Sequence, residues 1–175
     1  MDKLKNAAPP ELGPVETPAE AIRGSQIVCT MTTARKPVFD GNDLEPGTTV
    51  IPAGSNRAAN REVDDETFRR AARGRIATDS LEGARIESGD LIRAVAARAI
   101  DWGQVVEIGQ IASGKMPGRA SADEINMFVS QGVGIEDVAI GAEIYKRAKA
   151  AGAGEDQTLA HKAPTHRRLR VAQGQ

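Results

Sequence analysis

Residues 48–64 read TTVIPAGSNRAANREVD, an apolar run followed directly by a turn of glycine, serine and asparagine. The β-branched residues of the run predict a strand over residues 48–53. Small ligands bind at the carboxyl ends of strands in open α/β sheets, and this turn stands at such an end. Gly54 lets a backbone approach a ligand closely, and Asn56 offers both a hydrogen-bond donor and an acceptor. The turn alone is equally typical of an ordinary connection, so the neighbouring segments must decide between the two interpretations.

Strand-like runs alternate with helical segments on both sides of this turn. Residues 26–32 and 75–79 are further strand candidates. Helices are expected over residues 18–23, 64–72, 81–92 and 102–112. Thr17 is the expected N-cap of the first helix and Gly24 its terminator. This alternation predicts an α/β fold with a mostly parallel sheet.

Two later stretches carry their own patterns. Residues 121–124, Ser-Ala-Asp-Glu, have the form of a capping box, which predicts the start of a helix. Beyond them, apolar residues recur at helical spacing and Gly152 follows the last of them, so a helix is expected over residues 132–152. That stripe consists of Ile135, Val138, Ala142 and Tyr145.

The composition is that of a globular domain. The chain has 175 residues, 40% hydrophobic and 27% charged, which favours one domain. A net charge of −1 argues against a general nucleic-acid binder. The single cysteine, Cys29, cannot form an internal disulfide and is expected to be a small buried hydrophobic residue. No apolar stretch has the length of a membrane helix and the start is no signal peptide, so a cytoplasmic location is expected.

The last segment, residues 153–175, differs in kind from the rest. It is polar, and a basic run passes through Lys162, His166 and Arg167. A disordered basic tail is the expected structure, with an RNA- or membrane-touching arm as the alternative. His161 and His166 are not expected to form a metal site, because the two could share an ion only in a fold that nothing in the sequence indicates.

Many short motifs occur in one order and spacing along the chain. They are Ile27–Thr33, Lys36–Val38, Leu44–Thr48, Gly54–Asn56, Arg61–Asp65, Thr78–Ser80, Glu87–Leu91, Gly114–Arg119, Asp123–Ile125 and Phe128–Asp137. This ordered set closely resembles the second half of the ornithine cyclodeaminase/μ-crystallin family of NAD(P)-dependent enzymes. The resemblance covers roughly residues 13 to 150.

The resemblance implies a domain plan. Residues 1–12 are expected to be a helix remnant, 13–131 a partial Rossmann-like NAD(P)-binding domain and 132–152 a C-terminal helix. The family's phosphate loop, Gly-x-Gly-x-x-Gly/Ala, occurs nowhere in the 175 residues. The sheet should therefore lack its first strand and present an exposed edge where further strands would pair. The family also implies a strand over residues 125–130, against the capping-box prediction, and we follow the family here.

The resemblance also assigns site residues. Asn56 stands where ornithine cyclodeaminases have an aspartate that acts in proton transfer, and Asn60 where many members have a lysine that contacts the cofactor. Ser130 matches a serine near the nicotinamide carboxamide. The remaining cofactor-binding positions are Thr30, Met31 and Thr32, which match a segment lining the dinucleotide groove, together with Gly54 and Ser55.

An amide cannot accept a proton in general base catalysis, so Asn56 favours imine reduction or amino-acid dehydrogenation over cyclodeamination. The expected cofactor is NAD or NADP, the substrate a small amino or imino acid, and the partner a complementary half or a second copy. Glu87 and Asp90 are either acid/base candidates or solvated helix charges. The alternative function is a non-catalytic fragment or an interaction module without turnover of its own.

Overall fold

The computed structural model describes residues 13–155, which fall into two compact units divided between Gly134 and Ile135. The first unit holds the sheet, and the second holds one long helix. The expected helix remnant at residues 1–12 lies outside the described residues, as does the basic tail beyond residue 155, including His161 and His166.

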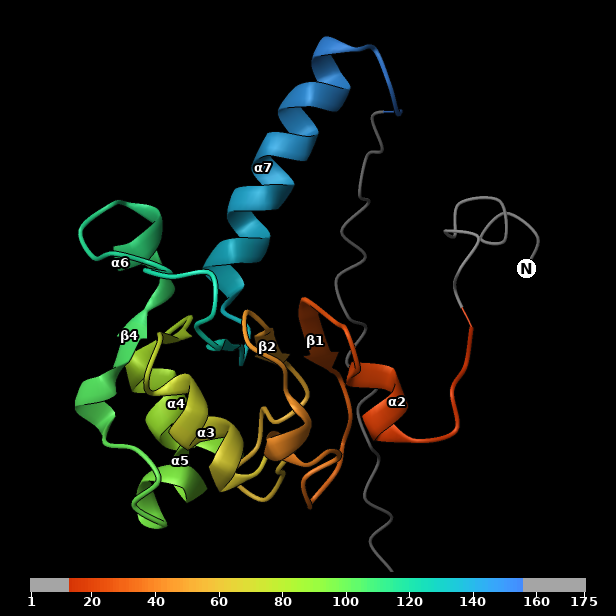
Figure 1. The fold of residues 1–175 in the computed structure, drawn as a ribbon. Helices are drawn as coiled ribbons and strands as arrows, with labels where there is room; N and C mark the ends of the chain where they lie inside the picture. The colour runs from red at the N-terminus through yellow and green to blue at the C-terminus, as the bar shows by residue number, and fades with distance from the viewer. Residues whose placement is uncertain (1–12, 156–175) are drawn as a thin grey trace, which may run out of the picture. The chain divides into compact units, whose positions relative to one another are not determined.

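The first unit is built on a five-stranded sheet in which every pair of neighbours is parallel (Figure 1). Its strands are β1 (Ile27–Thr30), β2 (Thr49–Pro52), β3 (Ile76–Thr78), β4 (Val105–Glu107) and β5 (Asn126–Val129). The spatial order is β1-β2-β5-β3-β4, so β1 and β4 are the edge strands. The predicted α/β fold with a mostly parallel sheet is confirmed, and its sheet has a free edge at β1.

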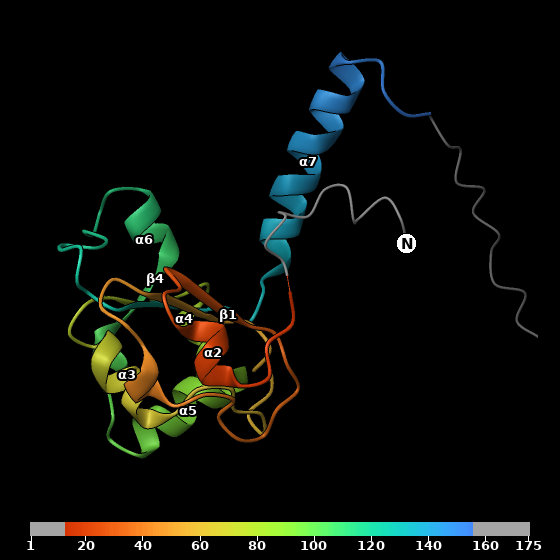
Figure 2. The ribbon, with the colours of Figure 1, turned by 45° about the vertical axis from the view of Figure 1, so that its right-hand side comes forward.

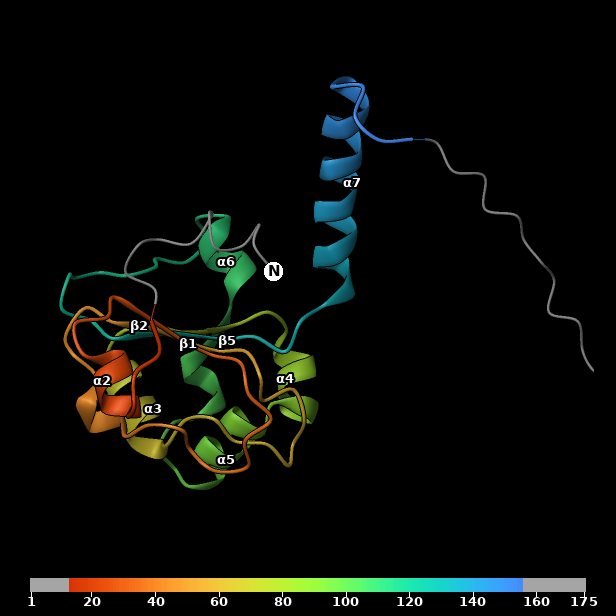
Figure 3. The same cartoon turned by 90° about the vertical axis from the view of Figure 1, so that its right-hand side faces the viewer.

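Helices lie on both faces of this sheet. Those of the first unit are α2 (Pro18–Ile22), α3 (Asp65–Ala71), α4 (Leu81–Glu87), α5 (Gly89–Ala96) and α6 (Ile108–Ala112). Figures 2 and 3 show α2, α3 and α5 on one side of the strands and α6 on the other. The predicted N-cap of α2 is confirmed: the Thr17 side chain accepts a hydrogen bond from the Glu20 N–H, and Gly24 follows with φ +69°.

The core fills the space between the sheet and these helices. Alternate residues of β2 and β5 point into it, so that Val50 and Val129 are fully buried. Phe68 of α3 and Leu91 of α5 are fully buried in the same cluster. Apolar burial of this kind supplies the main favourable free energy of folding.

In the part of the chain that the structure describes, the opposite side of β1 is exposed, and this corrects the prediction for Cys29. Val28 is buried, whereas Ile27 is 64% exposed. Cys29 shares the side of Ile27 because side chains alternate along a strand, and it is exposed. The apolar run indicated burial on both faces, as in a complete parallel sheet, but only one face of this edge strand is covered.

Two helix predictions were wrong in part. The helix expected over 102–112 is a short 3-10 turn, then strand β4, then the five-residue helix α6. Val105 and Val106 pair with β3 and are buried, so long-range strand pairing outweighs the helical spacing. The helix expected over 81–92 is broken at Ser88, which ends α4 and caps α5 by accepting the Leu91 N–H at 3.3 Å.

The strand implied over 125–130 is confirmed as β5, and the capping-box residues instead form a turn closed by the Glu124 N–H and the Ser121 carbonyl. The second unit contains α7 (Gly134–Ala150), which confirms the helix expected there. Its apolar stripe is exposed, with Ile135 at 74% and Val138 at 68%. Within the described residues, no helix is long and apolar enough to cross a membrane.

Replacing Phe68 by alanine should lower the free energy of unfolding by about 3–5 kcal/mol, because the residue is fully buried and the change leaves a cavity. Urea denaturation measures the loss. Ile86→Ala on α4 is the matched control, since Ile86 is 68% exposed and its truncation should change the free energy by less than about 0.5 kcal/mol. Equal losses in the two variants would contradict this description of the core.

Candidate functional site

All five strands end at one edge of the sheet, because parallel neighbours all run the same way. The Ala53 N–H donates to the Thr30 carbonyl at 2.8 Å, and the Ser130 N–H donates to the Pro52 carbonyl at 3.0 Å. Thr30, the Gly54 turn and Ser130 therefore stand side by side at the carboxyl edge of β1, β2 and β5. The structure brings these three predicted positions together, while their role in cofactor binding stays a prediction.

The turn after β2 contains both buried and exposed side chains. Ser55 is 1% exposed; its hydroxyl accepts the Asp90 N–H at 3.2 Å and donates to the Asn60 carbonyl at 3.3 Å. Asn60 is 8% exposed, so little of this predicted cofactor contact reaches the surface. Asn56 lies between them and is exposed. Of these three residues, Asn56 is the one whose side chain is exposed.

The segment after β1 shows a similar division. Thr30 is 7% exposed, and its hydroxyl oxygen is buried without a hydrogen-bond partner in the described part of the chain. Met31 is 77% exposed. Thr32 is exposed too, but its N–H and hydroxyl both donate to Glu62. Of these three residues, Met31 therefore has the side chain that is accessible and not engaged in a hydrogen bond.

Asp79, at the end of β3, organises the loop after β5. Its Oδ2 accepts the Ser130 hydroxyl at 3.1 Å, the Gln131 N–H at 2.8 Å and the Gly132 N–H at 2.6 Å. Gly132 has φ +79°, a conformation that glycine adopts without strain. The Ser130 hydroxyl is thus held by Asp79. The Thr78–Ser80 motif marked this place in the sequence, without revealing which groups the carboxylate binds.

Two further acids lie beneath the turn, and sequence reasoning missed what they do. Glu62 and Asp90 are both fully buried. Asp90 Oδ1 accepts the backbone N–H groups of Glu62 at 2.8 Å and Val63 at 3.0 Å. Asp90 is therefore not a solvated helix charge, whereas Glu87 is exposed. Asp90 lies 27 residues from Val63 and 28 from Glu62 along the chain, so no local spacing could have identified these contacts.

Burial raises the pKa of the Asp90 carboxyl, and the hydrogen bonds from the Val63 and Glu62 N–H groups only partly offset that effect. The nearby Glu62 carboxylate acts in the same direction as burial. Asp90 Oδ2 has no hydrogen-bond partner in the described residues, so an ionised Asp90 would hold charge on an unsolvated oxygen.

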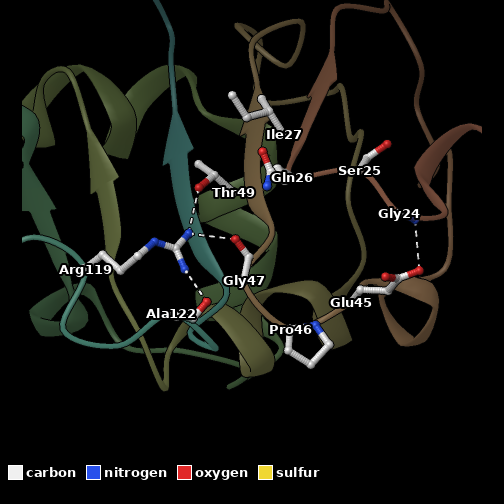
Figure 4. A pocket seen from close by; sticks show the side chains of 10 residues that line it. All are labelled: Gly24, Ser25, Gln26, Ile27, Glu45, Pro46, Gly47, Thr49, Arg119 and Ala122. Atoms are coloured by element: carbon white, nitrogen blue, oxygen red, sulfur yellow. Dashed lines mark hydrogen bonds between the residues drawn. The ribbon is translucent and has the colours of Figure 1, made fainter.

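A cavity of about 460 Å³ lies at the opposite, amino edge of β1 and β2 (Figure 4). Arg119 crosses it, donating to the Gly47 carbonyl at 3.0 Å, the Thr49 hydroxyl at 2.9 Å and the carbonyls of Ala122 and Glu124. These bonds join the loop before β5 to the start of β2. The Arg119 guanidinium is thus already hydrogen-bonded within the protein. The cavity lies at the amino edge of the strands and is not part of the carboxyl-edge site.

A metal centre has no support in residues 13–155: they contain no group of three or more histidine, cysteine, aspartate or glutamate side chains placed to hold an ion.

Comparison with known proteins places this geometry in a family. The model of the ornithine cyclodeaminase/mu-crystallin family matches residues 4–152. A putative dehydrogenase of Rhizobium meliloti is 38% identical over 138 residues, which are 78% of this chain and 41% of that protein. A Delta(1)-pyrroline-2-carboxylate reductase of Bacillus cereus is 33% identical over 137 residues, 78% of this chain and 41% of the reductase.

A solved structure gives the same result. Delta(1)-pyrroline-2-carboxylate reductase of Thermococcus litoralis, in complex with NADH and L-proline, matches with a TM-score of 0.72 and 35% sequence identity. The match covers 82% of this chain and 44% of the reductase. The chain therefore spans less than half the length of the relatives it matches, and its sheet is a partial Rossmann-like domain.

Replacing Asp90 by alanine should lower the free energy of unfolding by about 2–6 kcal/mol, because two buried N–H groups lose their acceptor. Asp90→Asn keeps an oxygen in place and should cost less. The wild type should lose stability relative to Asp90→Asn as the pH rises through the raised pKa of Asp90, since only the wild type has an ionisable group at position 90. Below the ordinary aspartate pKa, the difference should be constant.

Denaturation of both proteins from acid to neutral pH checks this. Glu87→Gln is the control, because Glu87 is exposed and its replacement should leave the pH profile of stability unchanged. A constant difference between wild type and Asp90→Asn at every pH would contradict the buried-carboxyl description.

Proposed function

The chain belongs to the ornithine cyclodeaminase/mu-crystallin family, and on that premise we propose that residues 13–131 form the nicotinamide side of an NAD(P)-dependent oxidoreductase acting on amino or imino acids. The observation that carries the proposal is the carboxyl edge itself. Thr30, Gly54 and Ser130 meet there, next to the exposed Asn56. Open α/β sheets bind their ligands at this edge.

The residues present fit one end of the cofactor. The exposed Asn56 amide offers both a donor and an acceptor, with which a carboxamide can pair. Met31 adds an exposed apolar side chain for an aromatic ring to contact. The sequence offers no comparable binding site for the pyrophosphate of the cofactor, because it contains no Gly-x-Gly-x-x-Gly turn. We therefore assign only the nicotinamide end to this chain.

The reaction we propose is reduction of an imine to an amine, or its reverse, oxidation of an amino acid. A bound nicotinamide supplies or accepts the hydride. Asn56 would orient the imine nitrogen or a water through its amide, but it takes no proton away. A carboxylate at this position would be needed for general base catalysis, so cyclodeamination fits less well than the two simpler reactions.

A second candidate is a non-catalytic piece that acts by binding a partner. The observation in its favour is the uncovered side of β1, where Ile27 and Cys29 are exposed beside the free edge of the sheet. The matching relatives are also more than twice as long as the matched region. The partner would be a complementary half or a second copy, in a cytoplasmic location.

Residues 1–175 alone should bind NADH and NADPH no tighter than millimolar and should not reduce Delta(1)-pyrroline-2-carboxylate. The physical reason is the missing set of backbone N–H groups for the pyrophosphate. Titration calorimetry and the absorbance of the reduced nicotinamide measure binding and turnover. Micromolar binding together with turnover would show a complete enzyme and overturn the assignment of only the nicotinamide end.

The position of the half-site has its own readout. In ¹⁵N NMR spectra, millimolar NADH should shift the amide signals of Met31, Asn56 and Ser130, which lie at the carboxyl edge. Adenosine monophosphate is the matched control: it shares the other end of the cofactor and should leave these signals in place. Equal shifts with both ligands, or shifts confined to the Arg119 cavity, would refute the nicotinamide assignment.

A further inference from the structure

Glu62 joins the two loops that would flank a nicotinamide. The residue is fully buried, and its carboxylate accepts three hydrogen bonds. Oε1 accepts the Thr32 N–H at 2.5 Å and the Thr32 hydroxyl at 2.7 Å, whereas Oε2 accepts the Gly54 N–H at 2.7 Å. Thr32 follows β1 and Gly54 follows β2. One side chain thus bridges two segments that the sheet itself leaves unpaired beyond Ala53.

The backbone of Glu62 is fixed on two sides as well. Its N–H donates to Asp90 Oδ1 at 2.8 Å, and its carbonyl accepts the Val38 N–H at 2.9 Å. Asp90 belongs to α5, in the layer beneath the sheet, and it is fully buried. Because the main chain is held in this way, the carboxylate has little freedom to leave the two loops.

The contact between the loops leaves no spare room. A Cβ atom added to Gly54 would lie 2.1 Å from the Thr32 carbonyl oxygen and 2.4 Å from the Thr32 nitrogen. Both are backbone atoms, so neither can rotate out of the way. Glycine at position 54 is therefore required for Glu62 to reach both N–H groups at once, and the distance between the loops is set by these two residues together.

The charge of Glu62 is balanced by N–H groups. No lysine or arginine forms an ion pair with it in residues 13–155. A buried carboxylate without a cation is tolerated where several donors point at it, and charge-assisted hydrogen bonds are stronger than neutral ones. Since the side chain is fully buried and its oxygens face the loops, it does not reach a ligand at the surface.

We propose that Glu62 is a positioning residue for the carboxyl-edge site: its carboxylate ties the loop after β1 to the loop after β2 and occupies the N–H groups of Thr32 and Gly54. The ligand is then met by what remains free, the side chains of Met31 and Asn56. The positioning role rests on the proposed function, because it assumes a nicotinamide at this edge. The link between the two loops rests on the hydrogen bonds of Glu62 alone.

The main test is Glu62→Gln in the full chain, followed by ¹⁵N NMR. Glutamine has the same shape but places an NH2 group where an acceptor is needed, so one loop loses its anchor. Amide hydrogen exchange at Thr32 or Gly54 should become about 10- to 100-fold faster, while exchange at Val50 and Met127 in the core should not change. The shifts that NADH causes at Met31 and Asn56 should disappear.

A pair of threonine variants keeps the proposal testable if Glu62→Gln does not fold. Thr32→Val removes the hydroxyl bond to Glu62, together with the weaker bond that the hydroxyl accepts from the Ala34 N–H at 3.2 Å, and should speed exchange at Thr32 by about tenfold. Thr33→Val is the matched control, because the neighbouring threonine makes no hydrogen bond to Glu62 and should show wild-type exchange. Equal behaviour of the two variants would refute the tie.

The outcomes separate this inference from the proposed function. Unchanged exchange in Glu62→Gln overturns the tie between the loops, whatever NADH does. Faster exchange with NADH shifts that persist at Met31 and Asn56 overturns the positioning role and leaves the nicotinamide site standing. In the third outcome, exchange is faster in Glu62→Gln, but NADH causes no shifts in the wild type. That result overturns the proposed function and the positioning role that rests on it. The hydrogen bonds of Glu62 would then serve only to stabilise the fold.

Discussion

Three buried or half-buried acids hold the carboxyl edge of the sheet together by accepting backbone N–H groups. Glu62 ties the loop after β1 to the loop after β2, and Asp90 holds the backbone of Glu62 from below. Asp79 does the same for the loop after β5. Loops at the end of a parallel sheet lose their neighbours' hydrogen bonds, and an unpaired buried N–H is costly. The acids remove that cost and fix the loop positions.

This arrangement determines what the edge can bind. N–H groups that already donate to carboxylates are not available to an anion, and the acids oppose a phosphate nearby. The edge therefore suits a neutral, planar, amide-bearing group better than a pyrophosphate. That preference agrees with assigning to this chain the nicotinamide end of the cofactor and leaving the phosphates to a glycine-rich loop that its 175 residues do not contain.

The sequence predicted those parts of the fold that depend on local patterns. Runs of β-branched residues located β1, β2 and β3, and the Thr17 cap located α2. Strand β4 was missed because three residues inside a helical stripe gain their stability from β3, about thirty positions away. Cys29 was misjudged because an apolar run does not tell whether one or both faces of a strand are covered. The hydrogen-bond partners of Glu62 and Asp90 are about thirty positions away in the sequence as well. The sequence therefore predicted the turn after β2 but not the buried acids that hold it.

The turn after β2 separates the groups that hold the fold from the group that we propose as a ligand contact. Ser55 and Asn60 are buried and bonded to each other, and Gly54 cannot carry a side chain. Asn56, between them, is exposed and none of its side-chain atoms supports the loop. An aspartate could replace it without a buried charge or a lost hydrogen bond, and would add a proton acceptor at the mouth of the site. The choice between amide and acid at position 56 is therefore a choice of chemistry that the fold leaves open.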